Sequence, residues 1–172
     1  MGRYPVKCVE VLDRVACRIE RSGGAGYGSE AELTDSRQKT VASAVLLANS
    51  LADAKLIVFT RQGTMAGYVS NMRPERAPIF AFTPQEHVCR QLALCWGTHP
   101  VLLPFRDEPN DTIEAAETYL REKGLTRAKD NLVILSDLRA SDSQVDSIQV
   151  RQAKGGPTEE VGASLDESSM MD

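Results

Sequence analysis

Apolar residues recur with two different periods along this chain, and the first period is helical. Over Pro5–Glu20 they return at steps of three or four residues, which predicts an amphipathic helix that begins with proline in its first turn. The apolar face of this predicted helix consists of Val9, Leu12, Ala16 and Ile19. A second helix is predicted from about Thr34 to Asp53, with a centre of small apolar residues that suits close packing.

From Leu56 onward, short apolar runs alternate with helical segments. The near-continuous apolar runs favour an α/β fold with a parallel sheet that helices cover on both faces. The predicted strands are Leu56–Thr60, Ile79–Thr83, Val101–Phe105 and Leu132–Leu135, and the predicted helices are Thr64–Asn71, Gln85–Trp96 and Thr112–Lys123. Asp111 is predicted to cap the last of these helices, and Gly124 to end it. A final strand, Ser147–Arg151, alternates in period two, as an edge strand does.

Two segments show neither the helical period nor the apolar runs of strands. Four glycines among the seven residues of Ser22–Gly28 predict a linker, because glycine makes an ordered element costly in entropy. The polar, acidic and aromatic-free stretch after Lys154 is predicted to be disordered. The predicted organisation is a helix over residues 1–21, a linker over 22–31, an α/β domain over 32–153 and an acidic tail over 154–172.

Composition narrows the function classes. The chain has 24 acidic and 20 basic residues, and five of the acidic residues lie in the tail, so the body is nearly neutral. The sequence has no basic patch of the kind that binds nucleic acid. It also has no apolar run that reaches the roughly 18 residues of a membrane span. The four cysteines have spacings unlike those of metal or redox motifs. These features predict a cytoplasmic protein that binds neither nucleic acid nor membrane.

The loop after the first predicted strand is the strongest candidate site. The strand ends at Thr60, turns through Gly63 and enters a helix at Thr64. Such a turn directs backbone N–H groups and a hydroxyl beyond the strand end, which suits a phosphate or carboxylate, and Arg61 supplies positive charge. The alternative interpretation is a tight turn that merely places Met65 in the core.

Three motifs in succession resemble one protein family. They are T-R-x-G-x-x-A from Thr60, R-P-x-x-x-P-I-x-A-x-T from Arg73 and R-Q-L-A-L-x-W-G-x-x-P-V from Arg90. In order and spacing, from about residue 41 to residue 150, the chain resembles the C-terminal domain of pyruvate kinase. Gly2–Val6 is similar to the segment that starts the last helix of that family's catalytic barrel domain. The resemblance implies a three-layer α/β/α sandwich with strand order 3-2-1-4-5 and an antiparallel last strand.

The same resemblance implies a role without catalysis. Members transfer a phosphoryl group from phosphoenolpyruvate to ADP, and their metal carboxylates, monovalent-cation site and lysine lie on the barrel upstream of Gly2–Val6. No catalytic residue is therefore expected in this chain, and Mg²⁺ and K⁺ would belong to the barrel. The expected role is assembly of the oligomer and transmission of effector binding. The expected partners are a barrel domain or subunit, further copies of the chain and a phosphorylated metabolite.

The candidate effector site combines two loops. The anion-binding candidates are Thr60, Arg61, Gly63, Thr64 and Arg139. Members regulated by fructose bisphosphate carry a glycine-rich second loop, whereas Ser136–Val145 has no glycine and contains two aspartates, Asp137 and Asp142, that repel phosphate. Activation by fructose bisphosphate is therefore not favoured, and the loop is more similar to those of plastid-type and some bacterial members.

Three hypotheses follow for the chain as a whole. It is a truncated or split piece of a pyruvate kinase, an independent sensor of a phosphorylated metabolite, or an interaction domain whose crevice is vestigial. In each case the apolar face of the first helix lacks the structure that buries it in the family, so we expect the isolated chain to self-associate or to recruit a partner through that face.

Overall fold

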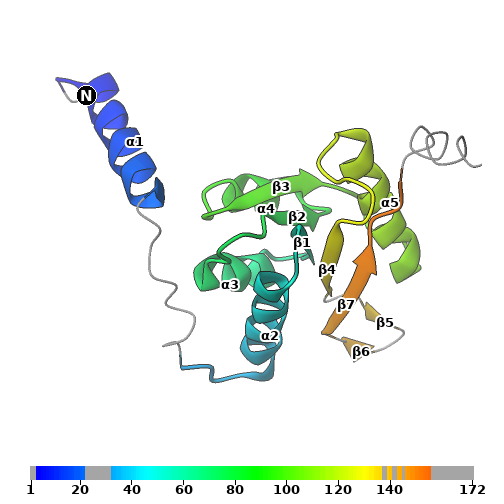
Figure 1. Ribbon diagram of the computed structural model, residues 1–172. Coiled ribbons are helices and arrows are strands. Elements are labelled where there is room, and N and C mark those ends of the chain that lie inside the picture. Colours follow the sequence, from blue (N-terminus) through cyan, green and yellow to red (C-terminus); the bar gives the residue numbers. More distant parts are fainter. Residues whose placement is uncertain (1–2, 22–31, 137–138, 141–142, 145, 156–172) are drawn as a thin grey trace, which may run out of the picture.

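The computed structural model describes residues 3–21, 32–136, 139–140, 143–144 and 146–155 (Figure 1). The predicted linker over 22–31 and the tail from residue 156 lie outside these ranges. The helices are α1 (Pro5–Arg21), α2 (Ser36–Ser50), α3 (Thr64–Met72), α4 (Glu86–Leu92) and α5 (Pro109–Glu122). The strands are β1 (Ala54–Phe59), β2 (Ile79–Thr83), β3 (Thr98–Leu102), β4 (Asn131–Ser136), β5 (Arg139–Ala140), β6 (Ser143–Gln144) and β7 (Ser147–Gln152).

Five of the strands form one sheet in the order β3-β2-β1-β4-β7. Three pairings are parallel: β1 lies parallel to both β2 and β4, and β3 lies parallel to β2. Only β7 is antiparallel, pairing with β4 from Ser136↔Ser147 to Asn131↔Gln152. The α/β fold class and the strand order expected from the sequence are thereby confirmed. Strands β5 and β6 form a separate two-stranded sheet.

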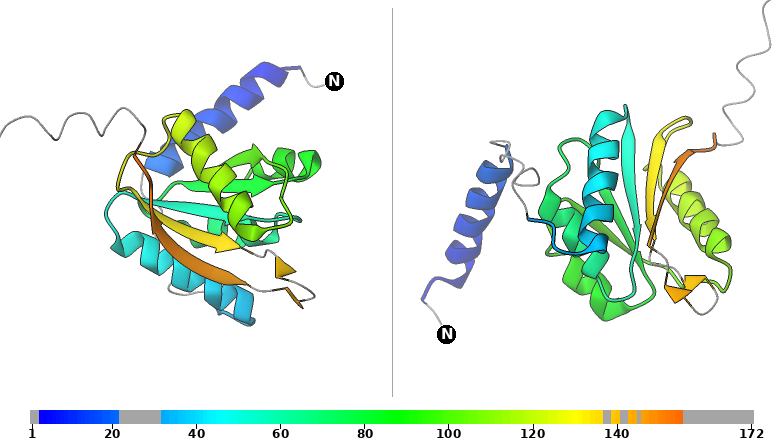
Figure 2. Two further views of the ribbon diagram at one scale, coloured as in Figure 1. Left: turned by 90° about the vertical axis from the view of Figure 1, so that its right-hand side faces the viewer. Right: turned by 90° about the horizontal axis from the view of Figure 1, so that it is seen from below.

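Helices cover both faces of the sheet, and alternate strand residues reach the two layers (Figure 2). In β1, Leu56 and Val58 are fully buried in a core that they share with α2, α3 and α4. Their neighbours Ile57 and Phe59 are buried on the opposite face, against α5. Because a strand with both faces buried needs apolar residues at every position, the continuous apolar runs in the sequence correctly predicted this sheet.

The helix ends show local chemistry that the sequence predicted in part. α2 begins where the carboxylate of Asp35 accepts a hydrogen bond of 2.8 Å from the backbone N–H of Gln38. Gly124, with a φ of +66°, ends α5 as predicted. The predicted cap of α5 was wrong: the helix starts earlier, at Pro109, and Asp111 lies inside its first turn. Proline at the first helical position is favourable because its missing N–H needs no partner there.

Two further predicted boundaries were wrong. α4 ends at Leu92 rather than Trp96, because the chain then tightens: the N–H of Cys95 donates to the carbonyl of Leu92 three residues earlier. β3 runs over Thr98–Leu102 and not over Val101–Phe105. Its register is set by pairing with β2, and Pro100 is tolerated because β3 is an edge strand.

Candidate effector site at the carboxyl edge of the sheet

Three buried hydroxyl residues mark the carboxyl ends of neighbouring strands. Thr60 follows β1, Thr83 ends β2 and Ser136 ends β4, and each is at most 5% exposed. Because β1, β2 and β4 are parallel, their carboxyl ends lie at one edge of the sheet. The order of the strands reverses between β1 and β4, and ligands of open α/β sheets bind outside such a reversal. The predicted candidate loops therefore start at this edge.

Backbone and side-chain hydrogen bonds of Thr60 stabilise the Thr60–Gly63 turn. The Thr60 hydroxyl oxygen accepts a hydrogen bond of 2.9 Å from the backbone N–H of Gly63, and the Thr60 N–H donates to the carbonyl of Phe82. Gly63 has a φ of +84°, and a Cβ there would lie 3.3 Å from Cγ1 of Val88. Thr60 is thus a structural residue of the turn, buried rather than facing solvent, and Gly63 is required by its backbone conformation.

The start of α3 has features of both interpretations of this loop, the anion-binding turn and the tight turn that places Met65 in the core. Met65 is buried in the core, as the interpretation of a simple tight turn requires. Thr64, the first residue of the helix, is exposed, and Gly63 at the N-cap makes no side-chain capping bond. The first N–H groups of a helix have no carbonyl partner within it and carry partial positive charge. The geometry is therefore that of a well-packed turn whose helix end faces solvent.

Arg61 places a positively charged side chain at this edge of the sheet. Its side chain is exposed, and its guanidinium carbon lies 5.2 Å from the ring centroid of Phe105, in the segment after β3. Phe105 in turn packs edge-to-face on Phe59, with centroids 5.8 Å apart. A guanidinium over an aromatic face keeps its charge and its N–H donors on the outer side. The sequence did not single out Phe105, because the contact joins two loops 44 residues apart.

The second predicted loop is described only in part. Arg139 lies in β5, where it pairs with Gln144 of β6, and Asp137 and Asp142 lie outside the described residues. The base of the loop is fixed by the hydroxyls of Ser136 and Ser147, whose oxygens are 2.8 Å apart. The fold brings the bases of the Thr60 and Arg139 loops to one sheet edge, since β1 and β4 are paired neighbours.

An ion pair beside this loop was missed by sequence reasoning. Asp146, directly before β7, accepts a hydrogen bond of 3.1 Å from Nε of Arg37 in the first turn of α2. The two residues are 109 positions apart, so no local pattern could have indicated the pair. Among the described residues, no three His, Cys, Asp or Glu side chains come together as a metal site.

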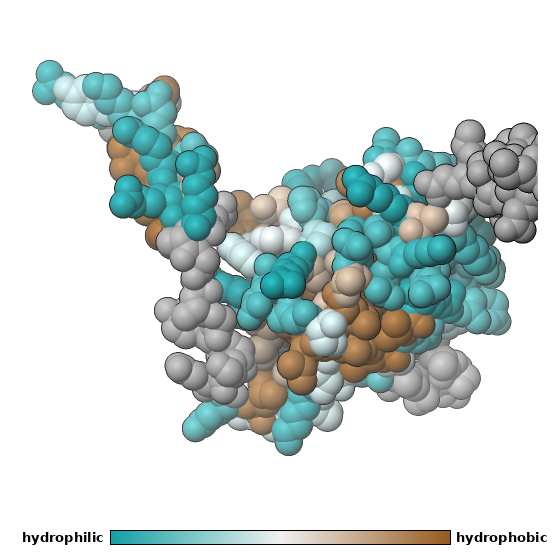
Figure 3. Space-filling view, in the orientation of Figure 1, coloured by the Kyte–Doolittle hydropathy of each residue, from teal (hydrophilic) through white to brown (hydrophobic). Residues whose placement is uncertain are grey.

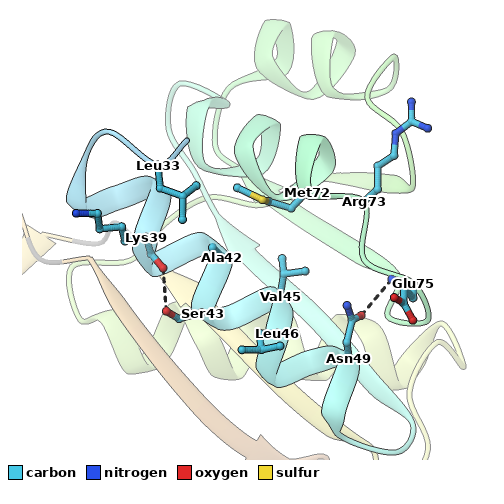
Figure 4. Close-up of a pocket in the computed structure, with 10 residues that line it drawn as sticks. All are labelled: Leu33, Lys39, Ala42, Ser43, Val45, Leu46, Asn49, Met72, Arg73 and Glu75. Carbon is cyan, nitrogen blue, oxygen red and sulfur yellow. Dashed lines mark hydrogen bonds between the residues drawn. The ribbon is translucent and has the colours of Figure 1, made fainter. Parts of the chain in front are cut away.

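A second cavity lies away from the sheet edge, between α2 and the chain after α3 (Figure 4). Its volume is about 590 Å³, within the range of ligand and partner sites. Leu33, Ala42, Val45 and Met72 form its apolar lining, and Leu46 stands at its margin. We call it the α2 groove. Nothing in the sequence predicted it, because its two walls are separate elements.

The comparisons with known proteins agree on one family. Residues 38–151 match the family model described as "Pyruvate kinase, alpha/beta domain". A chain with this three-layer fold, this strand order and a turn of this kind after β1 is an α/β domain of the C-terminal pyruvate kinase type. The chain belongs to the pyruvate kinase family through that domain.

Individual relatives show how much of the family's length is present. Pyruvate kinase isozyme A of tobacco chloroplasts is 33% identical over 150 residues, which are 82% of this chain and 25% of the relative. Pyruvate kinase 2 of Synechocystis is 33% identical over 90% of this chain and 26% of its own length. The chain therefore spans about a quarter of the length of these relatives.

A solved structure confirms the fold. Cryptosporidium parvum pyruvate kinase in complex with ADP superposes with a TM-score of 0.64 over 72% of this chain and 25% of its own, at 21% identity. At that identity the likeness concerns the fold alone. None of the described helices is long and apolar enough to cross a membrane.

Proposed function

We propose that this chain is the regulatory and assembly domain of a pyruvate kinase and does not transfer phosphoryl groups without a catalytic barrel. The family match to the α/β domain over residues 38–151 carries the proposal. The chain's share of about a quarter of its relatives, all named pyruvate kinases, supports it. In this proposal the Mg²⁺ and K⁺ of the reaction bind the barrel, and this domain contributes contacts between subunits.

The first test identifies what accompanies the chain in its source cell. A tag at the C-terminal end is expected to recover either a longer tagged chain or a separate barrel-bearing subunit. The purified 172-residue chain, assayed alone, is expected to form no ATP from phosphoenolpyruvate and ADP. A small chain recovered alone, or transfer by the purified chain, would contradict the proposal. Imaging of the same tag tests the predicted cytoplasmic location against the chloroplast location of the tobacco relative.

We further propose that the carboxyl edge of the sheet binds an anion, with Arg61, Thr64 and the first N–H groups of α3 as donors. Arg139 is the candidate from the second loop. Thr60 and Gly63 support this site indirectly, through the hydrogen bond that shapes the turn. The exposed Arg61 beside the exposed end of α3 supports a phosphorylated metabolite as the ligand. The same observation is compatible with the second candidate function, a sensor that binds the metabolite and acts without an enzyme.

Thermal unfolding in the presence of phosphorylated metabolites tests the anion site. A ligand at a hundred times its dissociation constant is expected to stabilise the fold by about 2.7 kcal/mol, a readily measured shift. Arg61→Ala should remove most of this shift, because it deletes the charge that faces the ligand. Arg90→Ala is the matched control, since Arg90 is an exposed arginine that forms an ion pair with Glu86 on α4, away from the start of α3. Equal shifts in both variants would reject Arg61 as a ligand, and no shift with any metabolite would reject the site.

A further inference from the structure

The last described residues lie at the amino edge of the sheet, the edge opposite the candidate anion site. Strand β7 runs antiparallel to β4, so its last residue, Gln152, lies beside the start of β4. The N–H of Ala153 then donates to the carbonyl of Asp130, and the N–H of Lys129 donates to the carbonyl of Ala153. Figures 1 and 2 show the end of β7 beside the connection from α5 to β4. The chain therefore leaves the sheet next to this connection.

Exposed basic side chains are concentrated where the chain leaves. We call them the basic cluster, and its members are Lys123, Arg127, Lys129 and Lys154. The turn that carries two of them is fixed by hydrogen bonds: the N–H of Arg127 donates to the Asp130 carboxylate at 2.9 Å, and the N–H of Asp130 donates to the carbonyl of Arg127. Figure 3 shows largely hydrophilic surface over the end of α5 and the connection that follows. A partner at this surface is therefore bound through charge rather than through apolar contact.

Little acidic charge on the described surface offsets this cluster. The carboxylate of Asp130 is buried and already forms an ion pair with Lys55, at 3.4 Å. Glu122, in the last turn of α5, is the exposed acidic residue beside the cluster. Asp53 and Glu75 are also exposed, but they lie further along the edge, before β1 and β2. The side of the amino edge formed by α5, β4 and β7 therefore carries net positive charge.

The sequence that follows supplies the opposite charge. Residues 156–172, which we call the acidic segment, contain no lysine or arginine, and their acidic residues are Glu159, Glu160, Asp166, Glu167 and Asp172. We propose that the acidic segment binds the basic cluster of its own chain. An anionic partner of the cluster would then have to displace the segment. The candidate anion site is at the opposite edge of the sheet, so this inference does not rest on the proposed function.

Covalent attachment beside the cluster favours contact within one chain. Glu159 follows Lys154 by five residues, which span at most about 17 Å. Two of the intervening residues, Gly155 and Gly156, have no side chain to restrict the direction of the chain. Single exposed ion pairs are weak, but a group on a short flexible linker has an effective concentration in the millimolar range. Several weak pairs that form together at this concentration are enough for a populated contact.

Zero-length cross-linking of the 172-residue chain with a carbodiimide, which joins a carboxylate to a lysine amine in contact, tests the proposal. Links from residues 156–172 are expected at Lys123 and Lys129. Lys7 and Lys39 are matched internal controls, because both are exposed and lie on α1 and α2. The links should disappear in about 1 M NaCl, where charges are screened beyond about 3 Å. Equal linkage of all four lysines, or no link to the cluster, would overturn the proposal.

Isotope mixing separates contact within one chain from contact between copies. Chains labelled with nitrogen-15 are mixed with unlabelled chains before the carbodiimide is added, and the linked peptides are weighed by mass spectrometry. Each linked pair is expected to carry a single isotope. Pairs that combine both isotopes in statistical proportion would show that the acidic segment binds a second copy, and the proposal would fail.

Charge reversal and truncation give an independent check. The double variant Arg127→Glu, Lys129→Glu should lose the links to Lys123, whereas the control Lys39→Glu should keep them. Ending the chain after Gly155 leaves the described fold intact, so it tests the contact even if the double variant does not fold. Amide resonances of residues 123–130 are expected to shift on truncation at low salt and to coincide with those of the full chain at high salt. Identical spectra at low salt, or links that survive the double reversal in a folded chain, would contradict the proposal.

Discussion

Replacing Gly63 by valine is expected to lower the free energy of unfolding by about 1–3 kcal/mol and to abolish any anion binding at the start of α3. The backbone at Gly63 has a φ of +84°, which a β-branched residue adopts only with strain. Its Cβ would also lie 3.3 Å from Cγ1 of Val88, so α4 would have to move. Because the N–H of Gly63 donates to Thr60, the change disturbs the turn that directs the helix end.

Gly67 provides the matched control within the same helix. It lies inside α3, and a Cβ added there meets no atom within 4 Å. Gly67→Ala should therefore raise stability by about 0.5–1 kcal/mol, through the higher helix propensity of alanine. Urea unfolding measures both variants, and isothermal titration with the metabolite that stabilises the wild type measures binding. Equal stability of the two variants would show that the turn tolerates a side chain at Gly63.

Phe82→Ala is expected to have the largest effect on stability, a loss of about 3–5 kcal/mol. Phe82 is completely buried in β2, stacks on Phe59 at a centroid distance of 5.5 Å and meets Tyr119 of α5 edge-on at 6.1 Å. Its removal would leave a cavity between the sheet and α5, the one helix described on that face. Domains of this size have a free energy of unfolding of about 5–15 kcal/mol, so this single change would remove a large part of the stability of the fold.

Denaturant unfolding measures this loss as a lower midpoint at an unchanged slope. Leu94→Ala serves as the control, because this exposed side chain buries little and should change stability by less than about 0.5 kcal/mol. If Phe82→Ala lowers the free energy of unfolding no more than Leu94→Ala does, the core on the α5 face must collapse to fill the cavity.

Local patterns predicted the elements and the resemblance predicted their arrangement. The continuous apolar runs indicated buried parallel strands, and the structure confirms β1, β2 and β4 with small shifts at their ends. The errors fell where tertiary pairing overrides local preference. β3 is placed by its register with β2, against the local signal of Pro100, and α4 stops before Trp96 because the chain turns toward that strand.

For the candidate site too, the sequence predicted one part and the structure supplied another. The sequence identified Thr60, Arg61 and Gly63, because a strand, a glycine and a helix in succession define a turn on their own. It could not separate their roles. The structure shows that Thr60 supports the turn from a buried position and that Arg61 is exposed over Phe105. These roles depend on which residues lie opposite in space, and that information is absent from a local motif.

By itself, the sequence determined the α/β class, the family and the residues of the Thr60 turn, because hydrophobic period and turn chemistry act over a few neighbouring positions. Only the tertiary structure decided the rest: the contact of Arg61 with Phe105, the pair of Arg37 with Asp146 and the groove beside α2. Each of these joins segments that are distant along the chain. Their positions follow from the packing of whole helices on the sheet, which no single stretch of sequence encodes.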